Sequence, residues 1–151
     1  MTMRVMAPPL EPTRSVVFAV SVIVLLVAHQ VGDHVFQTDH QATRKVDRSP
    51  AGLRAMLGHL AGYHATAAAA LAGTGAVLGI PLTIRGVVAG LAFSALTHGL
   101  LDRRWPVRVI LRLTRSSNFA DRTAPICGMY VADQALHQAA LLVSALLIAT
   151  L

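Results

Sequence analysis

Long apolar stretches alternate with polar connections along the whole chain. Four such stretches can be drawn, at residues 15–36, 53–80, 82–101 and 126–151. Each has about 20 residues or more, which as a helix is enough to cross a hydrocarbon core of about 30 Å. The second is the least apolar, because glycines and histidines dilute its first half. The pattern predicts an all-α fold, a polytopic four-helix membrane bundle.

The polar connections carry helix signals of their own. Residues 37–50 are polar and are expected to form a loop, with helix-start signals at Thr38, Asp39 and the pair Ser49-Pro50. Between residues 105 and 114, apolar residues recur at helical spacing with arginines between them. We expect this segment to be a short amphipathic helix at the membrane interface, anchored by Trp105.

The whole chain fits a single membrane domain. Residues 1–13 are proline-rich and are predicted to form a disordered tail, whereas residues 14–151 form one four-helix transmembrane domain. The first apolar stretch is longer than the core of a signal peptide and carries His29 and Asp33, so we expect a retained helix. The only cysteine, Cys127, excludes an intramolecular disulfide.

Composition and charge support the membrane interpretation. Charged residues make up 13% of the chain and hydrophobic residues 54%, whereas soluble domains carry about 25% charged residues. The net charge is +6, but the basic residues are concentrated in or beside the two long connections. They are Arg44, Lys45, Arg48, Arg54, Arg103, Arg104, Arg108, Arg112, Arg115 and Arg122.

Only Arg4, Arg14 and Arg85 fall on the opposite side of the predicted bundle. By the positive-inside rule, both long connections face the cytoplasm and both termini lie outside. The basic residues are expected to form a solvated rim against membrane lipid. The basic residues lie next to the predicted membrane ends, and the sequence has no helix-turn-helix pattern. We therefore expect no nucleic-acid partner.

Three apolar stretches each hold one His and one Asp four residues apart, and a further histidine lies on the remaining stretch. These residues are His29 and Asp33, His98 and Asp102, Asp133 and His137, and His59. A four-residue step returns to nearly the same face of a helix. Ionisable groups inside membrane helices cost roughly 2.5–3.5 kcal/mol each, so they are rare without a purpose. The predicted topology places all four sets in the cytoplasmic third of the bilayer, which indicates one polar site.

Imidazole nitrogens and carboxylate oxygens suit a divalent metal ion. Zinc is the first candidate, with iron or manganese as alternatives, and the lack of thiolates disfavours a structural zinc site. An ion would offset the cost of burying three aspartates, and the groups suffice for one or two ions. The predicted metal ligands are His29, Asp33, His59, His98, Asp102, Asp133 and His137.

Other interpretations of the same residues remain open. Each Asp could orient its own His instead of binding the ion. The cluster could also be a metal-free proton relay, or a buried polar network that fixes helix packing. His34, His40 and His64 are expected to be interfacial.

The order of these motifs resembles a known family. The run HQVGDHVFQTDHQATRK, residues 29–45, resembles the opening signature of a family of small bacterial integral-membrane proteins of unknown function. That family continues with a His in its second helix, then His-x-x-x-Asp and Asp-Gln-x-x-His, which match residues 59, 98–102 and 133–137 here. The resemblance covers residues 29–137 and departs at His34 and His40, where the family has aromatic or apolar residues. It implies a helical bundle in the bacterial inner membrane.

The family has no established reaction, but its His/Asp arrangement is similar to that of bacterial membrane-bound metal-dependent hydrolases. By this analogy the chain is expected to be a membrane-embedded metal-dependent hydrolase. Its substrate would be amphiphilic, lipid-like or phosphorylated, and reached from the cytoplasmic side. The metal would be held by His29, His98 and His137. The aspartates at 33, 102 and 133 would be ligands, orienting groups or the catalytic base.

We expect Arg103, Arg104 and Arg108 to attract an anionic headgroup. Two other classes of function are alternatives. The same groups could transport or sense metal ions or protons, which would need a homo-oligomer to form a path. Alternatively, the chain could be a non-catalytic membrane protein whose basic surface docks a partner.

Overall fold

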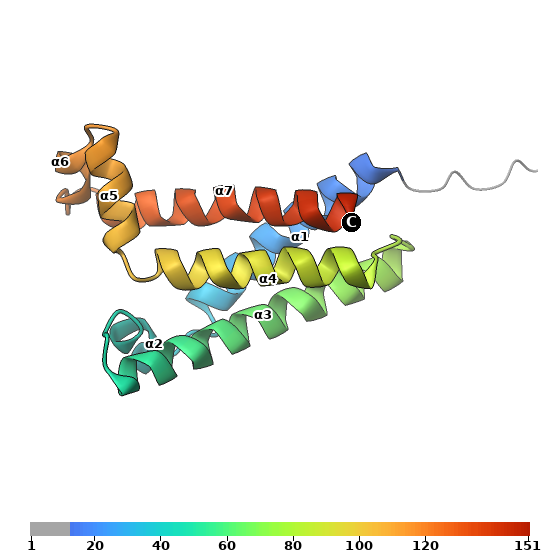
Figure 1. Cartoon of the computed structure of the whole chain (residues 1–151), viewed down its shortest axis with the longest axis horizontal. Helices are drawn as coiled ribbons and strands as arrows, with labels where there is room; N and C mark the ends of the chain where they lie inside the picture. The colour runs from blue at the N-terminus through green and yellow to red at the C-terminus, as the bar shows by residue number, and fades with distance from the viewer. Residues whose placement is uncertain (1–12) are drawn as a thin grey trace, which may run out of the picture.

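The computed structural model describes residues 13–151 of the chain (Figure 1). This part contains seven helices and no strand, which confirms the all-α prediction. The helices are α1 (Arg14–His34), α2 (Asp39–Arg44), α3 (Pro50–Leu78), α4 (Ile84–Leu101), α5 (Trp105–Leu113), α6 (Ser117–Ala120) and α7 (Gly128–Thr150). Apart from Thr13, the predicted disordered tail lies outside the described residues.

Each predicted apolar stretch corresponds to one long helix, namely α1, α3, α4 or α7. Three of them, α1, α4 and α7, are long and apolar enough to cross a membrane. Helix α3, which covers the least apolar stretch, is not among them. The predicted amphipathic helix corresponds to α5, and α2 and α6 are additional short helices in the two long connections.

Local sequence signals explain where several helices begin and end. At α2, Thr38 and Gln41 form a capping box, in which each side chain accepts a hydrogen bond from the other residue's backbone N–H. At α3, the Ser49 hydroxyl accepts from the Gly52 N–H, and Pro50 occupies the first turn. Helix α3 ends at Gly79, whose φ of +64° favours glycine.

The short helices all lie at one end of the bundle. Figure 1 shows α2 beside the start of α3, and α5 and α6 beside the start of α7, while the C-terminus lies at the opposite end. Both long connections and their basic residues therefore meet at the end where α1 and α4 finish. The predicted up-and-down connectivity is consistent with this arrangement.

An apolar core fills the half of the bundle away from the short helices. Its buried members come from α1, α3 and α7, and α4 packs beside them through partly buried side chains. The buried residues are Val17, Leu25, Ala28, Ala67, Leu71, Leu141, Ala145 and Ile148. This core holds the helices together and leaves the other end for polar side chains.

Close packing of α4 on α7 depends on glycine, and this gives a first prediction. A Cβ atom at Gly90 would lie 2.7 Å from the Ser144 carbonyl oxygen, whereas one at Gly62 would meet no atom within 4 Å. We expect Gly90→Ala to destabilise the bundle by about 1–3 kcal/mol, because the α7 backbone cannot yield as a flexible side chain would. Gly62→Ala should leave the thermal unfolding midpoint in detergent unchanged. Equal midpoints for the two variants would contradict this packing.

Candidate metal centre

Four side-chain atoms converge at the polar end of the bundle. Three belong to residues within helices, and the fourth belongs to the residue that caps one of these helices. Nε2 of His59 and Nε2 of His98 lie 2.9 Å apart. Each of these nitrogens lies 3.3 Å from Oδ1 of Asp33 and 3.3 Å from Oδ2 of Asp102. We call these four atoms the tetrad. His59 comes from α3, His98 from α4 and Asp33 from α1, while Asp102 caps the C-terminus of α4.

The spacing of the tetrad fits a tetrahedral metal ion. Zinc binds imidazole nitrogen and carboxylate oxygen at about 2.0–2.1 Å, and a tetrahedron with that radius has edges of about 3.3–3.4 Å. The four His–Asp distances of 3.3 Å match this edge, and the His–His distance of 2.9 Å is slightly shorter. His59, His98 and Asp102 form one group of possible metal ligands, and His29, Asp33 and His98 form another, so an ion could lie among these atoms.

Hydrogen bonding alone does not satisfy the tetrad. Its side chains are at most 7% exposed. Among the residues that the structure describes, Asp33 Oδ1 and Asp102 Oδ2 have no hydrogen-bond partner of good geometry. Two imidazole nitrogens 2.9 Å apart can share only one proton between them. Buried polar atoms without partners are costly, and a cation between them would satisfy both oxygens.

A second group of ligand atoms adjoins the tetrad. One ligand atom each of Asp102, Asp133 and His137 lies within 4.8 Å of the others, so Asp102 belongs to both groups. Asp133 Oδ1 and His137 Nε2 are buried without a hydrogen-bond partner within residues 13–151. His29 closes the cluster, with its ring 5.2 Å from that of His137 and its Nδ1 3.4 Å from Asp33 Oδ2.

The structure thus brings all seven predicted residues together at one depth. His29, Asp33 and His98 also form a group of possible metal ligands, so His29 stays a candidate ligand beside His59. Contacts between helices are as close as contacts within one His/Asp pair. Asp33 lies as near to His59 and His98 on other helices as to His29 on its own helix.

Lys45 is a member of the site that the sequence analysis missed. It was expected on the solvated basic rim, but it is buried, and its ammonium lies 2.7 Å from Asp102 Oδ1 and 3.3 Å from His59 Nε2. Helix α2 accounts for the difference, because it folds back against α3 and ends at Lys45. Burial alone would raise the pKa of Asp102, but the imidazoles of His59 and His98 and the charge of Lys45 hold it below its usual range.

The formal charge of the cluster also favours a divalent cation. Three carboxylates, from Asp33, Asp102 and Asp133, face the single ammonium of Lys45. Arg104 lines the same inner cavity. With the four histidines neutral, three carboxylates therefore face two cations, and a divalent ion would offset the remaining negative charge inside the bundle.

Neighbouring groups orient two of the histidines for coordination through Nε2. Nδ1 of His137 lies 2.9 Å from the backbone oxygen of Asp133 and donates to it, which leaves the Nε2 lone pair free. The side-chain amide nitrogen of Gln37 lies 2.9 Å from Nδ1 of His59 and donates to it. With the amide oxygen and nitrogen of Gln37 exchanged, Nδ1–H would donate to the oxygen instead, and Nε2 of His59 would be free to bind a metal. No sequence motif had drawn attention to Gln37.

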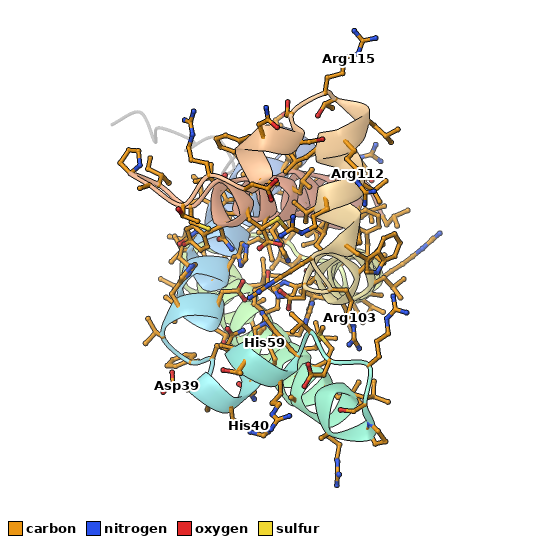
Figure 2. The ribbon with its side chains drawn as sticks, turned by 90° about the vertical axis from the view of Figure 1, so that its left-hand side faces the viewer. Asp39, His40, His59, Arg103, Arg112 and Arg115 are labelled. Carbon is orange, nitrogen blue, oxygen red and sulfur yellow. The ribbon has the colours of Figure 1, made fainter. Side chains whose placement is uncertain are left out.

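The three remaining histidines have separate surroundings. His34 is exposed and lies 2.6 Å from the hydroxyl of Tyr130, and His40 is exposed on α2. His64, which was expected to be interfacial, is half-buried between α3 and α4. There its Nδ1 donates to the Leu60 carbonyl oxygen at 2.8 Å, and Nε2 accepts from the Ser94 hydroxyl at 3.2 Å. Figure 2 shows His40 at the outer edge and His59 further inward.

Two adjoining cavities lead from the solvent to the cluster. The inner cavity, about 180 Å³, is lined by Asp33, Lys45, Asp102 and Asp133 of the cluster and by Arg104 and Tyr130. The outer cavity, about 430 Å³, shares Arg104, Tyr130 and Asp133 and adds Arg108 and Arg122. Arg103 was also expected near a headgroup, but its Nη1 donates to the Asp47 carbonyl oxygen at 2.7 Å, and it lines neither cavity.

Comparison with known proteins identifies a family whose function is unknown. Residues 21–151 match a family described as a protein of unknown function, DUF3307. No curated protein and no solved structure matches the chain. The match covers all seven residues of the cluster, and it carries no relationship to hydrolases.

Proposed function

The chain belongs to the DUF3307 family of proteins of unknown function, and from its polar cluster we propose that it is a membrane-embedded metal-dependent hydrolase acting on an amphiphilic substrate. The observation that carries the proposal is the tetrad, whose histidine nitrogens lie 2.9 Å from each other and 3.3 Å from each carboxylate oxygen. It is supported by the cavity that connects the tetrad to solvent.

In this proposal His59, His98, Asp33 and Asp102 hold one divalent ion, with zinc as the first candidate. Such an ion lowers the pKa of a bound water toward about 7 and polarises a phosphoryl or carbonyl oxygen. His29 and His137 complete the wall of the site. The group of Asp102, Asp133 and His137 could hold a second ion, since Asp102 has an oxygen in both groups.

We assign Asp133 as the general base. It lies outside the tetrad, is half-buried, lines both cavities and has a free carboxylate oxygen. In hydrolysis, the oxygen of water forms a bond to the phosphorus or carbonyl carbon, and the ester bond breaks. Asp133 takes a proton from the attacking water and returns it to the leaving oxygen, so the products are an alcohol and an acid.

Two features favour hydrolysis over transport through the chain. Both cavities beside the cluster lie at the end of the bundle that holds the short helices. The buried apolar core, which includes Leu25, Leu71 and Leu141, fills the interior beyond the cluster. An ion that left the tetrad toward the opposite end would meet only apolar side chains and a few buried hydroxyls, such as those of Ser21 and Ser144.

We place the protein in the bacterial inner membrane, with the cluster facing the cytoplasm. Support comes from three helices that could cross a membrane and from the basic residues at the cluster end. A substrate with an apolar chain could then keep that chain in lipid while its head enters the inner cavity.

The test is elemental analysis of the detergent-purified protein, combined with hydrolysis of decyl phosphate and of decyl carboxylate esters. We expect about one or two equivalents of zinc, iron or manganese, and turnover of at least one substrate class that a chelator abolishes. Asp133→Asn should keep the ion of the tetrad and lower the rate by about 10²–10⁴-fold, the usual share of a general base. Asp39→Asn, an exposed aspartate on α2, is the control (Figure 2).

A wild-type protein that stays metal-free after reconstitution would refute the proposal. The His/Asp cluster would then be a proton relay or a network that fixes helix packing. A metal-loaded protein whose hydrolysis is equal in the wild type and Asp133→Asn would refute the role of Asp133.

A further inference from the structure

The two cavities beside the cluster share part of their lining, and basic side chains outnumber acidic ones in the outer cavity. Arg104, Tyr130 and Asp133 line both of them, so one guanidinium faces the inner and the outer space. Lys45 adds a cation at the inner end, and Arg108 and Arg122 add two at the outer end. These positions sit in a row from the metal centre outward.

Arg104 adopts an unusual backbone conformation where the two cavities meet. Its φ is +62°, in the left-handed region that non-glycine residues rarely adopt, and it caps the N-terminus of α5. This bend carries the chain from α4 into α5. Strain of this kind persists only where the surrounding structure holds it, and it is frequent at ligand sites.

Asp121, one of the two acidic residues that line the outer cavity, is a weak competitor for its arginines. Asp121 Oδ1 lies 3.3 Å from Arg108 Nη1, but the Asp121 side chain is 74% exposed. An exposed pair of this kind contributes little. A phosphoryl group, which offers several oxygens to planar guanidinium forks, can replace the carboxylate on Arg108.

From this row of cations we propose that the entrance binds a diphosphate group, so that the substrate is an amphiphilic diphosphate ester. The inner phosphoryl group would lie beside the tetrad, Lys45 and Arg104. The outer one would lie against Arg108 and Arg122. This inference rests on the proposed hydrolase function and names its substrate class.

Apolar surface beside the entrance suits the rest of such a substrate. Val35 and Phe36 at the end of α1, and Val131 on α7, are large apolar side chains that are exposed. They flank the exposed contact between His34 and Tyr130. A hydrocarbon chain leaving the entrance would pass over this surface into lipid.

The test is the binding of decyl diphosphate, decyl phosphate and inorganic diphosphate to the metal-loaded protein in detergent. We expect decyl diphosphate to bind at least about tenfold more tightly than decyl phosphate, because a second charged group gains further hydrogen bonds. The double variant Arg108→Gln, Arg122→Gln should lose this preference and keep its affinity for decyl phosphate. Inorganic diphosphate, which has no decyl chain, shows how much of the affinity comes from the diphosphate group and how much from the hydrocarbon.

The matched control is the double variant Arg112→Gln, Arg115→Gln, which removes the same charge from the same segment. Arg112 and Arg115 line neither cavity, and Figure 2 shows Arg115 extending outward. The control should retain the preference for diphosphate. If it loses as much affinity as the Arg108, Arg122 variant, attraction is by general charge and the inference is wrong.

The metal content of every sample keeps the two proposals apart. A metal-loaded protein that hydrolyses decyl phosphate but binds both esters equally would overturn the diphosphate site and leave the hydrolase proposal standing. A metal-free, inactive protein whose diphosphate preference depends on Arg108 and Arg122 would overturn the hydrolase proposal and support the anion site.

Discussion

Replacing His98 with Ala is expected to abolish stoichiometric metal binding. Its Nε2 lies 2.9–3.3 Å from the three other tetrad atoms, so its loss opens the coordination shell and leaves two carboxylates facing one imidazole. Residues that only orient a metal ligand typically change affinity by 10–100-fold, so we expect a loss of about a hundredfold or more for a ligand itself. Metal content after dialysis against a weak chelator measures this directly.

His64→Ala is the matched control for His98→Ala. The ring of His64 lies 6.2 Å from that of His98, yet its two nitrogens interact with Leu60 and Ser94 rather than with the cluster. It should retain the wild-type metal content. Because removal of a buried ring can also unfold the bundle, helix content should be measured for each variant, and His59→Gln provides a smaller change at the tetrad. Full metal content in folded His98→Ala would rule out the tetrad as the site.

The sequence was sufficient to predict the long helices and the meeting of the His/Asp pairs. Hydrophobic runs set helix length, and the four-residue step keeps each pair on one face. Since consecutive helices reverse direction, residues late in α1 and α4 meet residues early in α3 and α7. The sequence therefore predicts, without detailed knowledge of packing, that one depth of the bundle holds Asp33, His59, Asp102 and His137.

The sequence could not show which atoms would meet across the helices. Helix rotation decides that Nε2 of His59 lies 2.9 Å from Nε2 of His98, and no periodicity within one helix carries that information. The location of Lys45 depends on α2, whose capping box at Thr38 and Gln41 was visible only in part as a helix-start signal. A count of basic residues in a connection cannot tell a buried lysine from a solvated one.

Lys45→Met is expected to destabilise the metal-free protein strongly. Its ammonium lies 2.7 Å from Asp102 Oδ1, and both side chains are at most 10% exposed. Removing one partner of a buried ion pair leaves the other charge uncompensated, which typically costs about 3–5 kcal/mol. Arg44→Met is the matched control, since the neighbouring Arg44–Asp47 pair is 56% and 41% exposed and should contribute at most about 1 kcal/mol.

The response of Lys45→Met to metal distinguishes a metal centre from a structural network. If a divalent ion binds the tetrad, its charge also compensates Asp102, so the penalty should shrink when zinc replaces chelator in the unfolding experiment. In a network that only fixes helix packing, Lys45 is the cation that balances Asp102, and the penalty should be the same in zinc and in chelator. Since Lys45 and the ion would share one carboxylate, Asp102 couples the stability of the bundle to occupancy of its metal site.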